Sequence, residues 1–417
     1  MAPNRPEYDP VSLAPLTFWG KTPAERERDF AILRDECPVS WHPPAEGAMM
    51  PPEGDGFWAI TRHADIVAIS KNAKDFSSAQ GVMMENVPED LLEASMSFLA
   101  MDAPRHTVLR KLISSAFTPR QVAKIDEQIQ GQARRIVDEL IETGDCDFVD
   151  EVARKLPMWT IYEMFGLPEE HHLAAAHSAD GMVSWADEEV RGGKEPAELI
   201  NDSLLTLITI GIDLAESRRR QPRDDLMTNL VQAEVDGLRL TDEEIAAFFV
   251  LLSVAGNDTT RHTITSAMKA LTDFPDQRKT LTADLDATIG TAVDEFIRWA
   301  SPVMTFRRTA TRDLELHGRQ IRAGDWVVLC YASGNRDDRA FTEPNSFDVR
   351  RTPNNHVGFG GGGAHFCMGH SLAKTQLRAI FGQLLCRVPD LRVGEPVPVV
   401  GNFVDAVKSM PCTLNLS

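Results

Sequence analysis

The chain has 417 residues, of which 43% are hydrophobic and 25% charged, and it carries a formal net charge of −19 at pH 7. This composition is ordinary for a soluble globular protein with a sizeable core and excludes a disordered or fibrous chain. The acidic balance argues against wholesale binding to nucleic acid or to an anionic membrane surface, because both would repel the protein.

The N-terminal stretch MAPNRPEYDPVSLAPLTFWG is rich in proline and charge and contains no apolar run of the length of a signal peptide or a membrane anchor. We therefore expect a cytoplasmic protein. No repeat, low-complexity tract or linker divides the sequence, which predicts a single domain over residues 1–417. Six scattered cysteines without a Cys-x-x-Cys pair indicate neither a disulfide framework nor a zinc knuckle.

The periodicity of the sequence predicts mostly helices. Residues 57–70, FWAITRHADIVAIS, indicate a short strand that runs into a helix, and helical spacing dominates from about residue 119 to 300. Residues 241–272 open with a Thr-Asp-Glu-Glu cap and exceed the average helix length, and their apolar centre predicts a helix that crosses the core. Residues 313–334 alternate like a small hairpin sheet, so the expected fold class is mainly α with a small β region.

The polar cluster AGNDTT, residues 255–260, lies in the middle of that apolar helix. A glycine costs about 1 kcal/mol in a helix interior, and buried Asp and Thr cost more unless they are paired. One interpretation is a kink in which threonine hydroxyls bond back to the backbone. The other is a small pocket over a cofactor, where a local widening of the helix places Asp258 and the Thr259 hydroxyl to deliver protons.

The stretch HVGFGGGGAHFCMGHSLAK, residues 356–374, gathers glycines around Cys367. Three of these glycines fit the Gly-x-Gly-x-x-Gly spacing of a phosphate loop, but no repeating strand–helix–strand pattern surrounds them and Ala-His follows where a P-loop has Lys-Ser or Lys-Thr. The alternative is a metal bound by Cys367, with glycines that let a planar cofactor lie against the main chain. Apolar residues at helical spacing follow, so Cys367 stands at a helix N-terminus, where a thiolate is stabilised.

Five motifs carry a resemblance that covers nearly the whole chain. They are MDAPRHTVLRKLISSAFTPR (101–120), AGNDTT (255–260), EFIR (295–298), NRDDRAFTEPNSFDVR (335–350) and FGGGGAHFCMG (359–369). In this order they resemble the cytochrome P450 family, the haem-thiolate monooxygenases. The resemblance implies a mainly α fold, with many helices around a haem and a small β-sheet region, and an enzyme that inserts one atom of O2 into an apolar substrate.

The resemblance also implies which residues bind a haem b. Cys367 is then the axial thiolate ligand of the iron, and such ligation favours cleavage of the O–O bond. The other implied haem contacts are His106, Arg110, Ala255, Arg308, Phe359, Gly360, His365 and Gly369. Two histidines and two arginines of this set face the propionates, while Arg307 is expected to point elsewhere. Phe359 lies eight positions before Cys367, whereas seven is the commonest spacing in the family, so its packing against the sulfur stays open.

Two further groups of residues receive roles from the resemblance. Asp258 and Thr259 correspond to the acid–alcohol pair that supplies protons. Glu295 and Arg298, which alone would be a solvated ion pair of little worth, correspond to a buried structural network with Arg350 as its third member.

An apolar pocket for the substrate is expected from loops and from the central helix. Its candidate lining residues are Met83, Met84, Phe98, Val254, Val303, Met304 and Phe403. The motifs are most similar to those of actinobacterial lipid and steroid oxidisers, which implies a methyl-branched lipid, a steroid or a terpenoid, in that order.

Electrons are expected from NAD(P)H through a ferredoxin reductase and a ferredoxin. The protein is expected to be a monomer. A basic patch on the cysteine side would receive the ferredoxin, formed by Arg105, Lys111, Arg120, Lys374 and Arg378. Two alternatives remain. A peroxide-using haem-thiolate enzyme would lack the acid–alcohol pair, and a haem-binding sensor without turnover would show no substrate-dependent electron uptake.

Overall fold

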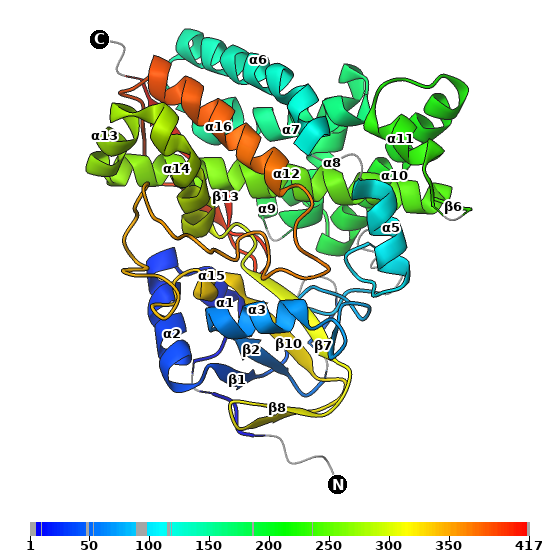
Figure 1. Ribbon diagram of the computed structural model, residues 1–417, viewed down its shortest axis with the longest axis vertical. Coiled ribbons are helices and arrows are strands. Elements are labelled where there is room, and N and C mark those ends of the chain that lie inside the picture. Colours follow the sequence, from blue (N-terminus) through cyan, green and yellow to red (C-terminus); the bar gives the residue numbers. More distant parts are fainter. Residues whose placement is uncertain are drawn as a thin grey trace.

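Figure 1 shows the computed structural model, which describes residues 6–9, 11–46, 50–52, 54–88, 98–114, 117, 119–185, 187–235 and 237–414. A large helical part, built from the middle and the end of the chain, lies against a smaller part that contains the main sheet and the first helices (Figure 1). None of the described helices combines the length and the apolar character needed to span a membrane.

The helical part contains most of the described helices. These are α5 (Arg105–Ser114), α6 (Pro119–Thr143), α7 (Lys155–Phe165), α8 (His172–Val183), α9 (Glu188–Arg191), α10 (Pro196–Arg220), α11 (Leu226–Gln232), α12 (Asp242–Asp273), α13 (Pro275–Ala283), α14 (Leu285–Ala300) and α16 (His370–Arg387), with a π-helical turn at Val149–Ala153 and a 3-10 turn at Glu169–His171. The smaller part contains α1 (Leu16–Trp19), α2 (Pro23–Glu36), α3 (His63–Lys71) and α15 (Tyr331–Gly334).

Helix α12 crosses the middle of the helical part, as its sequence predicts (Figure 1). Its start is fixed by a capping box, in which the Glu244 N–H donates to Thr241 Oγ1 and the Thr241 N–H donates to Glu244 Oε2. The polar cluster does not widen the helix: hydrogen bonding stays α-helical through residues 255–260, and Thr259 Oγ1 donates to the Ala255 carbonyl oxygen at 2.9 Å. The expected widening was therefore wrong, because the threonine hydroxyl is satisfied by the turn that precedes it.

The main sheet has five strands in the order β1-β2-β10-β7-β3. Its strands are β1 (Val39–His42), β2 (Phe57–Ile60), β10 (Trp326–Cys330), β7 (Thr305–Ala310) and β3 (Phe76–Ser77). β2 pairs in parallel with β10, and the other neighbours are antiparallel. Strand β2 leads into α3 as predicted. Neighbouring residues of a strand point to opposite faces, so Arg307 lies over the Trp326 ring, 3.6 Å from its centroid, whereas Arg308 borders a cavity.

Smaller sheets complete the fold. They are a hairpin of β8 (Leu314–Leu316) with β9 (Arg319–Ile321), a pair of β5 (Glu234–Val235) with β6 (Leu238–Arg239), a pair of β12 (Val397–Val399) with β13 (Ala406–Ser409), and a three-stranded sheet of β11 (Arg392–Val393), β14 (Pro411–Thr413) and β4 (Cys146–Asp147).

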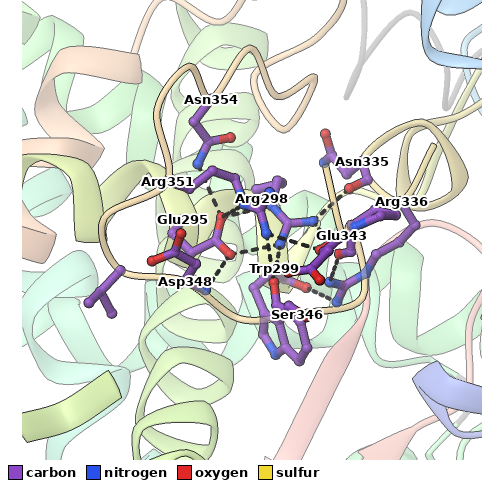
Figure 2. A network of polar contacts seen from close by, with 12 residues as sticks. Glu295, Arg298, Trp299, Asn335, Arg336, Glu343, Ser346, Asp348, Arg351 and Asn354 are labelled. Atoms are coloured by element: carbon purple, nitrogen blue, oxygen red, sulfur yellow. Dashed lines mark hydrogen bonds and ion pairs between the residues drawn. The ribbon is translucent and has the colours of Figure 1, made fainter. Parts of the chain in front are cut away.

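A buried ionic network ties α14 to the segment that follows α15 (Figure 2). Arg298 donates from Nε and Nη2 to the two carboxylate oxygens of Glu295, each at 2.7 Å, and neither side chain is exposed. Arg351 Nε donates to Glu295 Oε2 at 3.1 Å. The same carboxylate also accepts the Asp348 N–H at 2.9 Å and Asn354 Nδ2 at 3.1 Å. Each partner thus compensates a group that would be costly to bury alone.

The third member of this network is Arg351, so the prediction of Arg350 was wrong by one residue. Residues 348–351 form a turn, closed by the Arg351 N–H and the Asp348 carbonyl oxygen at 3.0 Å. Arg350 lies at the corner of that turn and is exposed, whereas Arg351 turns inward and also donates to the carbonyl oxygens of Thr342 and Ser346.

These two neighbouring arginines offer a matched test of the network. We expect Arg351→Ala to lower the free energy of unfolding by about 3 kcal/mol, because it strands part of a buried carboxylate. Arg350→Ala should change it by less than about 0.5 kcal/mol, since its side chain is at the surface. Urea denaturation of both variants measures the difference, and an equal, small effect would show that Arg351 contributes nothing to the network.

Candidate functional site

Cys367 ends a glycine loop immediately before α16. Its backbone N–H donates to the Phe359 carbonyl oxygen at 3.1 Å, which closes the loop. Gly360, Gly362 and Gly363 have positive φ angles of 92°, 94° and 77°, a conformation that costs side-chain-bearing residues energy. The loop therefore absorbs the additional residue between Phe359 and Cys367, and the Phe359 ring lies 6.0 Å from the His370 ring and 6.4 Å from the Phe366 ring.

Two glycines of this loop allow its backbone to pack closely against α3. A Cβ atom on Gly361 would lie 2.5 Å from Ser70 Oγ, and one on Gly363 would overlap the Ser70 carbonyl oxygen. The sequence did not indicate this contact, because α3 is almost three hundred residues earlier in the chain. The glycine run thus meets two demands at once, tight turns and a close approach to a helix.

The sulfur of Cys367 opens into a large cavity. The cavity lies deep in the protein, and this desolvation raises the pKa of the thiol above its usual value. The N–H groups of Gly369 and His370 and the guanidinium of Arg110 oppose that shift. A cation placed against the sulfur would complete the stabilisation of a thiolate, which is what a metal ion does for a cysteine ligand.

A cluster of basic side chains lies beside the same cavity. His106 and Arg110 come from α5, Arg308 from β7 and His365 from the glycine loop. The rings of His106 and His365 are 4.2 Å apart. Arg110 donates to the Phe366 carbonyl oxygen at 2.6 Å and Arg308 to the Arg307 carbonyl oxygen at 2.7 Å.

The cluster carries positive charge that no ion pair within the described residues balances. Within the described part of the chain, neither Arg110 nor Arg308 takes part in an ion pair, and the buried Nε2 atom of His106 has no hydrogen-bond partner. Burial and the nearby Arg110 lower the pKa of His106 although Asp102 opposes this shift, and burial with Arg308, His106 and Arg110 lowers the pKa of His365 to about 3. Such a site is complementary to an anionic group, above all to carboxylates.

Most of the residues that were expected to contact substrate or cofactor line this cavity. Those that line it are Met83, Phe98, Arg110, Val254, Ala255, Asp258, Thr259, Val303, Arg308, Phe359, Gly360, His365, Cys367, Gly369 and Phe403. Additional walls come from residues that the sequence did not single out, namely Ile161, Met182, Trp185, Phe248 and Leu251. These apolar side chains carry no local signal, because helix interiors commonly contain such residues.

Two of the expected pocket residues lie elsewhere. Met84 and Met304 are each 1% exposed and pack in the core between the sheet and the first helices, together with Leu13 and Phe18. Each directly follows a residue that does line the cavity, Met83 or Val303. Only one residue of each pair faces the cavity, and the other packs into the core.

Asp258 is buried and paired, which the sequence did not show. Its carboxylate forms an ion pair with Arg261 one turn later on α12, and Arg261 Nη1 lies 2.6 Å from Asp180 Oδ1 on α8. Burial raises the pKa of Asp258 to about 7 although Arg261 opposes this shift, and its Oδ2 atom has no hydrogen-bond partner. Asp258 and Thr259 both line the cavity.

Known proteins resemble this chain along almost its full length. A methyl-branched lipid omega-hydroxylase of Mycobacterium tuberculosis is 39% identical over 409 residues, which cover 97% of this chain and 94% of that protein. The family model described as Cytochrome P450 matches residues 194–388. The chain belongs to the cytochrome P450 family. A steroid C26-monooxygenase of the same organism is 37% identical over 389 residues, which cover 91% of this P450 and 87% of that one.

A solved P450 structure has nearly the same fold. The Mycobacterium marinum cytochrome P450 CYP268A2, in complex with pseudoionone, is 56% identical, with a TM-score of 0.96 and coverage of 99% of this chain and 100% of that one. Membership of this family of monooxygenases implies a haem iron and O2 as reactant. The residues present fit a haem, since Cys367 offers one soft ligand and the basic cluster offers partners for two propionates.

The basic cluster can be tested with two neighbours on α5. We expect Arg110→Ala to speed the transfer of haem to apomyoglobin by about 10- to 100-fold, the range of one or two charge-assisted hydrogen bonds. Lys111→Ala should leave the rate unchanged, since Lys111 is exposed. Arg110→Lys, which keeps the charge, should recover part of the loss. Equal rates for all three variants would mean that the cluster does not bind the propionates.

Proposed function

We propose that this P450 hydroxylates an apolar, methyl-branched substrate and that Cys367 is the axial ligand of its haem iron. The observation that carries the proposal is the Cys367 thiol opening on a largely apolar cavity, with a basic cluster beside it. His106, Arg110, Arg308 and His365 would bind the propionates. Ala255, Phe359, Gly360 and Gly369 border the same cavity as the sulfur and would contact the porphyrin.

The bound haem would supply the activation of dioxygen, and thiolate ligation favours O–O cleavage. The chain itself orients the substrate and excludes water. Met83, Phe98, Val254, Val303 and Phe403 give the cavity an apolar wall that matches a hydrocarbon. Methionine at this wall adds adaptability to branched shapes.

The proposed substrate class rests on the apolar wall of the cavity and on the substrates for which the similar proteins are named. The relatives are named for a methyl-branched lipid and for carbon 26 of a steroid, and the M. marinum structure contains pseudoionone. We therefore place a methyl-branched lipid first, a steroid second and a terpenoid third. Electrons would come from NAD(P)H through a ferredoxin reductase and a ferredoxin.

A panel of these three substrate classes tests the proposal. The purified protein should convert a methyl-branched lipid into a product that carries one 18O atom from 18O2 when NAD(P)H, reductase and ferredoxin are present. Product formed with hydrogen peroxide but never with 18O2 would instead favour the peroxide-using alternative. Binding of haem without any product from the panel would favour a sensor.

The basic patch proposed for the ferredoxin is smaller than the sequence suggested. Lys374 Nζ lies 2.5 Å from Asp294 Oδ1, and Arg105 forms an ion pair with Glu244, so both charges are compensated. The side chain of Arg120 lies outside the described residues. Lys111 and Arg378 remain exposed. Among the described side chains, steering of an acidic ferredoxin would therefore depend mainly on Lys111 and Arg378, and its rate should fall as salt rises.

Asp258 and Thr259 are proposed to deliver protons into the cavity. Asp258 Oδ2 can take up and release a proton, and Thr259 Oγ1, which donates to the Ala255 carbonyl oxygen, still offers lone pairs that can hold a water. Arg261 positions the carboxylate of Asp258. A proton path from the buried carboxyl to the cavity would thus need only short transfers through water.

Three substitutions on α12 separate these roles. We expect Thr259→Ala to keep haem, substrate binding and NAD(P)H oxidation. It should divert at least about half of the electrons to hydrogen peroxide, because the water in the cavity loses its hydrogen bond to the Thr259 hydroxyl. Asp258→Asn should slow turnover by about 10-fold or more with less diversion, since the proton donor is removed. Thr263→Ala is the matched control: Thr263 also lines the cavity, and its hydroxyl donates to the Thr259 carbonyl oxygen at 2.8 Å.

The measured quantity is product formed per NAD(P)H consumed. Thr263→Ala should be coupled as tightly as the wild type. If Thr259→Ala is equally well coupled, its hydroxyl only caps the turn of the helix, and the proposal for this residue fails.

A further inference from the structure

Two cysteines that are far apart in the sequence lie in contact. The Sγ atoms of Cys146 and Cys412, which are 266 residues apart, are separated by 3.3 Å. They are direct partners in the antiparallel pairing of β4 with β14. Directly paired residues of antiparallel strands have Cα atoms about 4.5 to 5.5 Å apart, within the range of about 4.4 to 6.8 Å that a disulfide spans.

Hydrogen bonds on both sides of the pair fix its register. The Met410 N–H donates to Asp147 Oδ2 at 2.9 Å, and the Phe148 N–H donates to the Met410 carbonyl oxygen at 2.8 Å. Beyond the pair, the Leu414 N–H donates to Asp145 Oδ1 at 2.9 Å. The two sulfurs are therefore already held close together. Formation of an S–S bond needs only a small local movement of the two cysteines and no diffusion of distant chain segments.

We propose that Cys146 and Cys412 form an intramolecular disulfide when the protein meets a peroxide. Cys146 is partly exposed and Cys412 is 2% exposed, so Cys146 reacts first. Its sulfur attacks the peroxide, an S–O bond forms, the O–O bond breaks and one water leaves. Cys412 then attacks the Cys146 sulfur and displaces a second water. The two thiols lose two protons and two electrons, and the peroxide is reduced to water.

The environment of Cys146 and Cys412 favours the protonated, unreactive form of both thiols. Burial raises the pKa of both thiols, that of Cys412 to about 12, and the nearby carboxylates act in the same direction. Lys155 and the hydrogen bond with Cys412 partly offset the shift at Cys146. Since the thiolate is the reactive form, oxidation should be slow, with Cys146 as the more reactive partner.

The disulfide would connect the cavity wall to the middle of the chain. β14 follows β13, which in turn follows the cavity-lining residues 399–404, whereas β4 lies between α6 and α7. A bond across this sheet closes a very long loop and restrains the unfolded chain. Oxidation should therefore stabilise the C-terminal part of the cavity wall.

The test uses the purified haem-loaded protein and a few equivalents of hydrogen peroxide, with the Soret absorbance as a check that the haem survives. After alkylation and digestion, mass spectrometry should find the Cys146 and Cys412 peptides linked, two hydrogens lighter than the separate peptides. The midpoint of thermal unfolding should rise by about 3 °C or more, and dithiothreitol should reverse both changes.

Three serine variants decide the outcome. Cys146→Ser and Cys412→Ser should each abolish the linked peptide and the rise in the unfolding midpoint. Cys386→Ser, which removes an exposed thiol on α16, should retain both. The proposal is overturned if peroxide oxidises Cys386 in the wild type while Cys146 and Cys412 stay alkylatable, or if the rise persists in Cys412→Ser.

Discussion

The buried contact between Glu295 and two arginines is the constraint on which the site depends. Removing one carboxylate and two guanidinium groups from water is expensive, and it succeeds only because every charge meets a partner. The partners come from α14 and from the segment between α15 and the glycine loop, as Figure 2 shows. The network therefore fixes where that segment lies. Asn335 continues the constraint, because its Oδ1 accepts the Val357 N–H at 2.8 Å just before the glycines begin.

The site itself has the opposite electrostatic character. Around Glu295 the carboxylate and the arginines are paired within the protein, whereas in the described chain Arg110 and Arg308 form no ion pair and His106 Nε2 has no hydrogen-bond partner. Burying such groups costs stability unless a ligand supplies the missing charge. We infer that haem binding and folding are coupled in this P450: the network orders the loop, and the propionates would compensate the cluster.

The sequence predicted the elements whose signal is local. The capping box of α12, the strand before α3 and the helix after Cys367 all follow from short patterns, and the structure shows each of them. The identity of the third network residue did not follow, because a turn at residues 348–351 decides which of two adjacent arginines points inward. Met84 and Met304 were also wrong by one residue, since each side chain packs into the core while the residue before it lines the cavity.

Contacts between segments that are far apart in the sequence could not be predicted, because no short sequence pattern indicates them. The pairing of Arg261 with Asp180, the approach of the glycine loop to Ser70 and the meeting of Cys146 with Cys412 all depend on how helices and strands pack. Ion pairs at Arg105 and Lys374 likewise reduce a basic patch that looked larger in the sequence. Charge counts along a chain do not show which charges meet.

The most direct test of the account is the absorbance spectrum of the reduced protein under carbon monoxide. We expect the red-shifted Soret band of thiolate ligation in the wild type. We also expect the loss of that band in Cys367→Ser, in any haem that the basic cluster still holds. A red-shifted band that persists in Cys367→Ser, or one that is absent from the haem-loaded wild type, would contradict the assignment of Cys367 as the iron ligand.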